Sequence, residues 1–222
     1  MYVCLEGVKG SGKSTILAGV LRWLDENRIE YVTVNPTRAA PPDTPLERAA
    51  VLRPHLRDCD GFNRRLYAAR FNYAMSHADW SHPLVLGDRS LVTTYVTRWT
   101  RWGSPQACIA RVEKSHVWAP APRHIIYLRA SLDVVCERIA RRVERNYGRH
   151  DETVDRLIDA MNAYDDIRFG RVEVPRLRGV RWHVIDTEQP VDRNIQRCVE
   201  IIAKAMQSDS IERNTAAPAI AR

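Results

Sequence analysis

The segment EGVKGSGKST, residues 6–15, constrains this 222-residue chain more than any other stretch. Gly7, Gly12, Lys13 and Ser14 have the spacing G-x-x-x-x-G-K-[ST] of a phosphate-binding loop (P-loop). Glycines let such a loop curl, so that successive backbone N–H groups point at phosphate oxygens. An apolar run precedes the loop and a helix-like pattern follows it, which is the context that the motif requires.

The P-loop predicts ATP and Mg²⁺ as cofactors. Lys13 is expected to bridge the outer phosphates, and the Ser14 hydroxyl to ligate Mg²⁺. The positive end of the following helix faces the same phosphates. The predicted cofactor-binding residues are Gly7, Gly10, Ser11, Gly12, Lys13, Ser14 and Thr15.

Strand-like and helix-like segments alternate along the chain. The expected strands are residues 2–6, 31–35, 83–88, 124–128 and 181–185. The expected helices are residues 13–26, 46–57, 62–80, 91–118 (two helices, broken at 103–105), 131–145, 151–168 and 190–206. Such alternation predicts an α/β P-loop three-layer sandwich, with a five-stranded parallel sheet flanked by helices and a helical lid.

The bulk composition sets limits on the class of protein. The length suits one kinase domain over residues 1–207, and the small and polar residues of 208–222 suggest a mobile tail. No apolar run is long enough to span a membrane, and no signal peptide is recognisable. Five scattered cysteines favour reduced thiols and a cytoplasmic location. The net charge of +7 suits a polyanionic partner, such as a nucleotide or nucleic acid.

Several segments, in order, resemble the thymidylate kinase family and more distantly the deoxynucleoside kinases. The likeness covers residues 2 to about 204 and is carried by YVCLEGVKGSGKST (2–15), PTRAAPPDTPLER (36–48), LYAARF (66–71), LGDRSLVTTY (86–95) and IIYLRASLDVVCERIARR (125–142). The resemblance implies a kinase that acts on a nucleotide, and a homodimer formed through helices near residues 46–80.

Asp88 and Arg89 match the family's Asp-Arg pair at the end of a central strand. Ligands of such sheets bind at the carboxyl ends of the strands. The resemblance implies that Asp88 orients the acceptor or a Mg²⁺-bound water. It implies that Arg89 holds an acceptor phosphate through charge-assisted hydrogen bonds.

Four further residues fall where the family contacts its acceptor. Arg38 matches an acceptor-side arginine, and Arg70 an arginine at the pyrimidine edge. Leu66 stands where the family usually has a phenylalanine stacked on the base, and Arg98 where it has a glutamine near the base.

The predicted lid spans about residues 141–151. It contains the basic cluster Arg141, Arg142, Arg145 and Arg149. In the family a lid arginine reaches over the transferring phosphate, so Arg142 and Arg145 are candidate catalytic residues. A solvated basic helix face is the alternative interpretation.

Lys9 departs from the family, which usually has an acidic residue there, near the acceptor's 3′-hydroxyl. A cation suits an anion instead, such as a 3′-phosphate inside a DNA chain. Alternatively, Lys9 is a local substitution that contacts ATP or an acidic neighbour.

The segment RWTRW (98–102) also allows two interpretations. On a helix, Tyr95, Trp99 and Trp102 form one stripe and Arg98 and Arg101 another. Such a surface suits stacked bases and a phosphate track. An aromatic core face with solvated arginines is the interpretation that the composition favours.

The sequence therefore predicts a kinase that moves the γ-phosphate of ATP to a deoxypyrimidine nucleotide, with a thymidylate-like monophosphate as the leading acceptor. Three alternatives stay open: a kinase of a modified pyrimidine within DNA, such as 5-hydroxymethyluracil; a deoxynucleoside kinase; and a nucleotide-dependent module without enzymatic activity.

Overall fold

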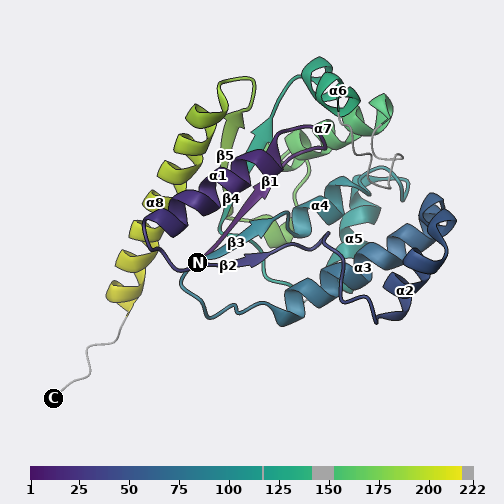
Figure 1. Cartoon of the computed structure of the whole chain (residues 1–222), viewed down its shortest axis with the longest axis horizontal. Helices are drawn as coiled ribbons and strands as arrows, with labels where there is room; N and C mark the ends of the chain where they lie inside the picture. The colour runs from purple at the N-terminus through teal and green to yellow at the C-terminus, as the bar shows by residue number, and fades with distance from the viewer. Residues whose placement is uncertain (117, 142–152, 217–222) are drawn as a thin grey trace.

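The structure, a computed structural model, describes residues 1–116, 118–141 and 153–216. Its centre is a five-stranded, all-parallel sheet in the order β2-β3-β1-β4-β5 (Figure 1). The strands are β1 (Tyr2–Glu6), β2 (Val32–Val34), β3 (Val85–Asp88), β4 (His124–Arg129) and β5 (Arg181–Asp186). The predicted fold class is confirmed, and each predicted strand is present within two residues of its expected ends.

Helices cover both faces of the sheet (Figure 1). One face carries α1 (Lys13–Glu26) and α8 (Val191–Ala216). The other carries α3 (Asp60–His77), α4 (Leu91–Val96), α5 (Pro105–Ser115), α6 (Leu132–Ala140) and α7 (Val154–Arg168). Side chains of β1 contribute to the core on both faces of the sheet. Val3 and Leu5 pack with α1 and α8, whereas Tyr2 and Cys4 belong to the core cluster on the opposite face. Alternate side chains of a strand point to opposite faces, so a strand buried on both faces is apolar throughout.

Several helices differ from their predicted extents, and two of the differences change the description of the chain. Residues 46–57 form α2 (Pro45–Leu52) and a separate 3-10 helix (Pro54–Asp58), because Pro54 has no N–H to continue the first helix. The predicted helix end at residue 206 is wrong, since α8 continues to Ala216. Within that extension Asp209 is buried and pairs with Arg123. The predicted tail therefore begins as helix, and residues 217–222 lie outside the described residues.

The aromatic segment after α4 is divided between core and surface. α4 ends at Val96, so residues 91–102 are not one continuous helix. Tyr95 and Trp99 are buried in the core, as the composition favoured. Trp102 is partly buried, and the Arg98 and Arg111 guanidinium carbons lie 5.3 and 5.2 Å from the centre of its ring.

Three further observations bear on the predictions. In the part of the chain that the structure describes, no helix combines the length and apolarity needed to span a bilayer. All five cysteines are free thiols. Most of the predicted lid, residues 142–151, lies outside the described residues.

Candidate functional site

The P-loop connects β1 to α1, as predicted. Gly7 has a φ of 154°, and a Cβ there would lie 2.6 Å from Ser11 Oγ and 2.7 Å from the Leu128 carbonyl oxygen. Gly12 has a φ of 84°, and a Cβ there would meet no atom within 4 Å, so its backbone conformation alone calls for glycine. α1 then begins at Lys13. The first N–H groups of an α-helix have no partner within the helix, so this end of α1 can bind an anion.

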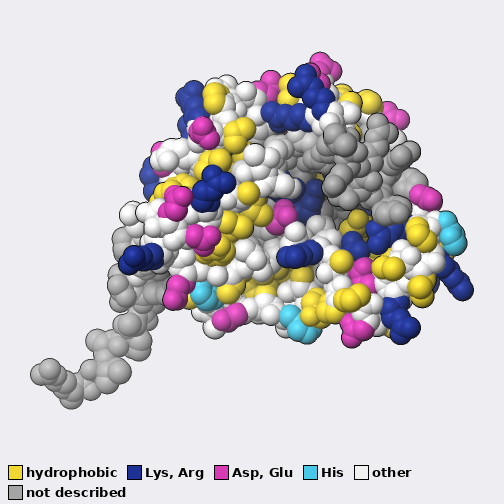
Figure 2. Space-filling view, viewed as in Figure 1, with side chains coloured by type: hydrophobic (Ala, Val, Ile, Leu, Met, Phe, Trp, Pro, Cys, Tyr) yellow, Lys and Arg dark blue, Asp and Glu magenta, His cyan; other side chains and the backbone are white. Residues whose placement is uncertain are grey.

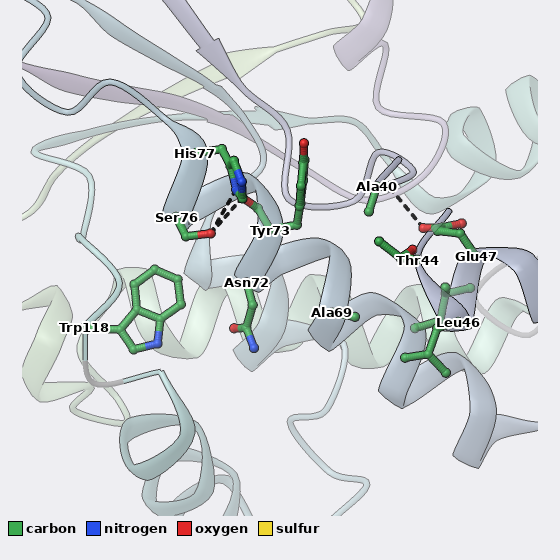
Figure 3. A pocket seen from close by; sticks show the side chains of 11 residues that line it. Ala40, Thr44, Leu46, Glu47, Ala69, Asn72, Tyr73, Ser76, His77 and Trp118 are labelled. Carbon is green, nitrogen blue, oxygen red and sulfur yellow. Dashed lines mark hydrogen bonds between the residues drawn. The ribbon is translucent and has the colours of Figure 1, made fainter. Parts of the chain in front are cut away.

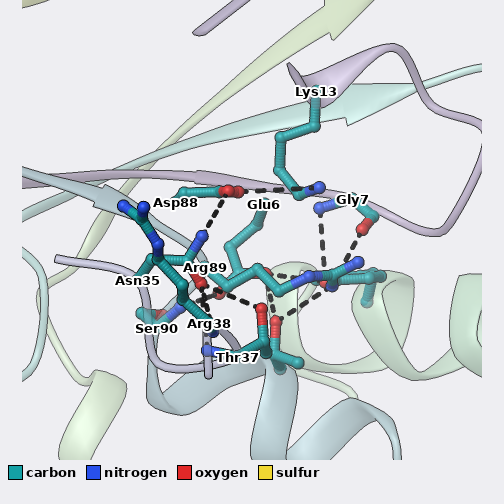
Figure 4. Close-up of polar contacts among 11 residues, drawn as sticks. Glu6, Gly7, Lys13, Asn35, Thr37, Arg38, Asp88, Arg89 and Ser90 are labelled. Atoms are coloured by element: carbon teal, nitrogen blue, oxygen red, sulfur yellow. Dashed lines mark hydrogen bonds and ion pairs between the residues drawn. The ribbon is translucent and has the colours of Figure 1, made fainter. Parts of the chain in front are cut away.

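Lys13 and Asp88 meet at the mouth of this loop (Figure 4). Register places Leu5 of β1 beside Asp88 at the end of β3, so the P-loop and Asp88 emerge together. Lys13 Nζ lies 3.7 Å from Asp88 Oδ1. Asp88 Oδ2 accepts a 2.8 Å hydrogen bond from Asn35 Nδ2. Asn35 Oδ1 in turn accepts from the backbone amides of Thr37 and Arg38, which fixes the turn after β2.

Arg89 holds an unusual backbone conformation beside the same loop. Its φ is 77°, which costs energy for a residue with a Cβ. Its backbone N–H donates to the Leu5 carbonyl at 3.0 Å. The guanidinium Nη1 donates to the Gly7 carbonyl and to Thr93 Oγ1, both at 3.3 Å. Arg89 therefore links β3, the P-loop and α4 with its side chain at the site.

Glu6 is a fully buried carboxylate immediately before the loop. Its Oε1 accepts from the backbone N–H and hydroxyl of Ser90, at 2.7 and 2.8 Å. Its Oε2 accepts from Thr93 Oγ1 at 2.7 Å and from the Tyr164 hydroxyl at 2.8 Å. Four donors satisfy most of the acceptor capacity of a carboxylate, so the charge is well solvated by the protein. The network ties β1, α4 and α7 together at the start of the P-loop.

A cavity of about 400 Å³, here called the central pocket, opens beside this network. The P-loop contributes Gly7, Val8 and Lys9 to its wall. A second wall is formed by residues between Arg89 and Trp102, which include α4. Residues of α3 and α7 line the remaining sides. The size suits a small-molecule ligand. Figure 2 shows Lys and Arg side chains in and around the hollow of the face drawn.

The predicted acceptor residues divide into two groups. Lys9, Arg89 and Arg98 line the central pocket. Arg38 is exposed and stands on the turn that Asn35 organises (Figure 4). Arg70 and Leu66 are not among the described residues that line the pocket, and their contacts with the acceptor stay predictions. Tyr67 and Phe71, which come from the same helix, line it instead.

Arg70 and Leu66 are both packed against other parts of the chain. Arg70 is buried, and its Nε and Nη2 donate to Glu47 Oε1 and Oε2 at 2.6 and 2.8 Å. Burial alone would raise the pKa of Glu47, but the hydrogen bonds from Arg70 hold it below its ordinary value. Leu66 is buried and lines a different hollow, of about 470 Å³. This hollow lies between α2, α3 and Trp118 (Figure 3).

Some predicted residues cannot be placed, and some important ones were not predicted. Arg142, Arg145 and Arg149 lie outside the described residues, so their roles stay predictions. Sequence reasoning did not single out Glu6, Asn35, Glu47 or Tyr164 as functional residues. An acid that ends an otherwise apolar strand is an unusual feature, and it could have drawn attention to Glu6.

The geometry fits a nucleotide with its metal ion. Asp88 Oδ1 is buried and makes no hydrogen bond within the described part of the chain. An unsatisfied carboxylate oxygen suits a hydrated divalent cation. Ser14, the other predicted magnesium ligand, is exposed in the first turn of α1. The arrangement can therefore hold phosphate groups at the P-loop and a second ligand in the central pocket.

Comparison with known proteins gives the family. No protein-family model matches the chain. The thymidylate kinase of Marinomonas sp. is 24% identical over 215 residues, which cover 91% of this chain and 94% of that protein. The thymidylate kinase of Symbiobacterium thermophilum is 26% identical over 212 residues, covering 90% and 92%. The probable thymidylate kinase of Methanothermobacter thermautotrophicus is 30% identical over 145 residues, covering 62% and 69%. With its P-loop geometry and sheet order, the chain belongs to the thymidylate kinase family and is a P-loop kinase.

Proposed function

We propose that the protein transfers the γ-phosphate of ATP to a deoxypyrimidine 5′-monophosphate, with thymidylate as the leading acceptor. The observation that carries the proposal is the shared wall: Gly7, Val8 and Lys9 belong to the P-loop and also line the central pocket. Donor and acceptor would therefore lie on two sides of one loop, which is the proximity that phosphoryl transfer requires. Relatives named thymidylate kinase, matched over most of the chain, support a nucleotide as acceptor.

The residues have complementary parts in this proposal. Lys13 and the N-terminus of α1 would bind the ATP phosphates. Ser14 and Asp88 would hold Mg²⁺, which when bound neutralises charge on the phosphates. Arg89, fixed by Gly7 and Thr93, would bind the acceptor phosphate. Arg142 and Arg145 of the lid would cover the transferring group.

The other acceptors rank behind a mononucleotide. The relatives carry the name of a mononucleotide kinase, and nothing in the comparisons favours DNA or a free deoxynucleoside. A pocket of about 400 Å³ also suits one nucleotide better than a duplex.

A panel of acceptors tests the proposal. Transfer from γ-labelled ATP would be followed with thymidylate, deoxyuridylate, deoxycytidylate, thymidine and duplex DNA. We expect the highest kcat/KM for thymidylate, and little transfer with Lys13→Ala. Efficient transfer to thymidine or to DNA, with none to thymidylate, would overturn the proposed acceptor while leaving the kinase assignment intact.

We also propose a homodimer through the α2–α3 surface. The hollow lined by Leu46, Tyr73 and Trp118 lies there (Figure 3). Nearby Val51 and Leu52 are 64% and 74% exposed. Burying such apolar side chains against a second copy would stabilise a dimer. Sedimentation of the wild type should give the mass of two chains, and Leu52→Glu should shift it toward one; a monomer at micromolar concentration would contradict this proposal.

A further inference from the structure

The central pocket is strongly basic. Among the described residues, its wall contains six basic side chains and two acidic ones. The basic residues are Lys9, Arg64, Arg89, Arg98, Arg101 and Arg156; the acidic residues are Asp60 and Asp159. A single acceptor phosphate needs only part of this positive charge, and Arg89 stands where it would bind.

Both acids of the wall are already engaged. Asp60 Oδ1 lies 2.6 Å from Arg101 Nη1, so this pair neutralises one arginine. Asp159 Oδ2 accepts a 3.2 Å hydrogen bond from Thr100 Oγ1. Arg64, Arg98 and Arg156 have no carboxylate at ion-pair distance within the described ranges. Among the described residues, no ion pair neutralises the charge of these three arginines.

Arg98 is the best-defined member of this group. Its Nη2 donates to the Arg64 carbonyl at 3.4 Å, and its guanidinium carbon lies 5.3 Å from the Trp102 ring centre. These contacts fix its head group between α3 and the turn after α4. Burial is the largest cause that lowers the pKa of Arg98, and Arg64 and Arg101 add to it, while Cys108 and Asp60 oppose it. A half-buried cation among other cations is costly, and an anion placed beside it would remove that cost.

This arginine is remote from the phosphate-transfer centre. Arg89 precedes α4 and Arg98 follows it, so the two stand at opposite ends of the helix. The six residues of α4 rise about 9 Å. An acceptor whose phosphate contacts Arg89 would thus present another part of its structure, its sugar or base, to Arg98 and Arg64.

We propose that the central pocket, besides taking thymidylate-like acceptors, binds more tightly a nucleotide with a second acidic group, a carboxylate or phosphate remote from the phosphate that accepts the transferred group, and that Arg98 and Arg64 bind this group. This inference rests on the proposed function, because it takes Arg89 as the site of the acceptor phosphate. The second acid could belong to the base or to the sugar, and the two sources share the same recognition chemistry: charge-assisted hydrogen bonds from guanidinium groups.

Binding measured by calorimetry without ATP tests the inference. The base arm compares 5-carboxydeoxyuridylate with its neutral isostere, 5-carboxamidodeoxyuridylate. The sugar arm compares thymidine 3′,5′-bisphosphate with thymidylate. We expect the acidic ligand of one arm to bind about tenfold more tightly than its control. Arg98→Gln and Arg64→Gln should abolish that preference, whereas Arg98→Lys should keep part of it.

A matched variant controls for effects on folding, and the outcomes do not depend on whether thymidylate is a substrate. Arg65 is an exposed arginine of α3, the helix that carries Arg64, and it does not line the pocket. Arg65→Gln should therefore keep the preference for the acidic ligand. Equal binding within both arms would overturn the inference, even if thymidylate is a good acceptor in the transfer assay. A preference that is lost in Arg98→Gln would support it, even if thymidylate accepts no phosphate.

Discussion

The Tyr164 hydroxyl donates a 2.8 Å hydrogen bond to Glu6 Oε2 and lies 3.3 Å from the backbone nitrogen of Gly7, whose N–H it accepts. One side chain of α7 thereby fixes both the buried carboxylate before the P-loop and the first glycine of the loop. Burial, together with the Glu6 charge, raises the pKa of this tyrosine well above its ordinary value, so it stays a donor at neutral pH. The helix that follows the predicted lid is in this way connected to the phosphate site.

Tyr164→Phe should destabilise the fold and weaken ATP binding. The change leaves Glu6 with one donor fewer in a fully buried site, which costs about 1–3 kcal/mol of unfolding free energy. Urea denaturation and calorimetric titration with ATP measure the two effects. Tyr73→Phe, the same change at a partly exposed tyrosine, is the matched control and should be close to neutral. Wild-type stability in Tyr164→Phe would contradict the anchoring role.

Asp88→Asn should reduce catalysis more than nucleotide affinity. Asparagine can still accept from Asn35, so the turn after β2 is preserved. It removes the charge beside Lys13, and we expect kcat to fall about 100-fold or more. The Kd for ATP, measured by calorimetry, should change much less. Asp43→Asn, at an exposed position, is the control. A normal kcat would show that Asp88 is only structural.

Glu47→Gln should unfold the protein at lower denaturant concentration, because it leaves the buried Arg70 charge without its partner. Breaking a buried ion pair costs about 3–5 kcal/mol. Glu137→Gln breaks an exposed pair with Arg141 and should cost less than about 1 kcal/mol. Equal effects of the two substitutions would refute the structural importance of the buried pair.

Stability should decrease as the pH falls from about 7 toward 5, in part because of two histidines. His124 Nδ1 lies 3.1 Å from His183 Nε2, on neighbouring strands. Burial is the main cause that lowers the pKa of both histidines, and Arg181 adds to it. His183 and Arg123 lower the pKa of His124 further, while Asp209 opposes them. The unfolded chain, with histidine pKa values near 6.5, therefore binds protons that the folded chain does not. The stability contributed by neutral histidines is lost as the pH falls.

Denaturation midpoints at several pH values measure this dependence. His183→Gln should flatten the profile, because it removes one of the two titrating groups and can still hydrogen-bond to His124. His55→Gln is the control, because it removes an exposed histidine and leaves the His124–His183 pair intact. A profile with an unchanged slope in His183→Gln would contradict the prediction.

The sequence-based predictions were accurate where local pattern determines structure. Four of the five strands are short runs rich in apolar or β-branched residues, and the P-loop motif requires a particular backbone conformation. The end of α8 was not predictable in this way, because residues after 206 lack an apolar period. There the hydroxyls of Ser208 and Ser210 donate to the carbonyls four residues before them, and Asp209 pairs with Arg123.

The site was harder to predict because its partners are distant in sequence. Asp88 was identified, but not Asn35, which is 53 residues away. The role predicted for Arg70 stays untested, but its ion pair with Glu47, 23 residues away, was not predicted. No local sequence pattern reveals whether an arginine forms an ion pair within the protein or binds a ligand. The central pocket likewise collects basic residues from the P-loop, α3, the turn after α4, and α7.

The measurement that tests the central claim most directly is identification of the reaction product. The full chain would be incubated with thymidylate, Mg²⁺ and ATP labelled in its γ-phosphate, and the nucleotides resolved by mass spectrometry. We predict thymidine diphosphate with the label in its β-phosphate, and none with Lys13→Ala. A folded protein that binds ATP but leaves thymidylate unlabelled would contradict the proposed reaction.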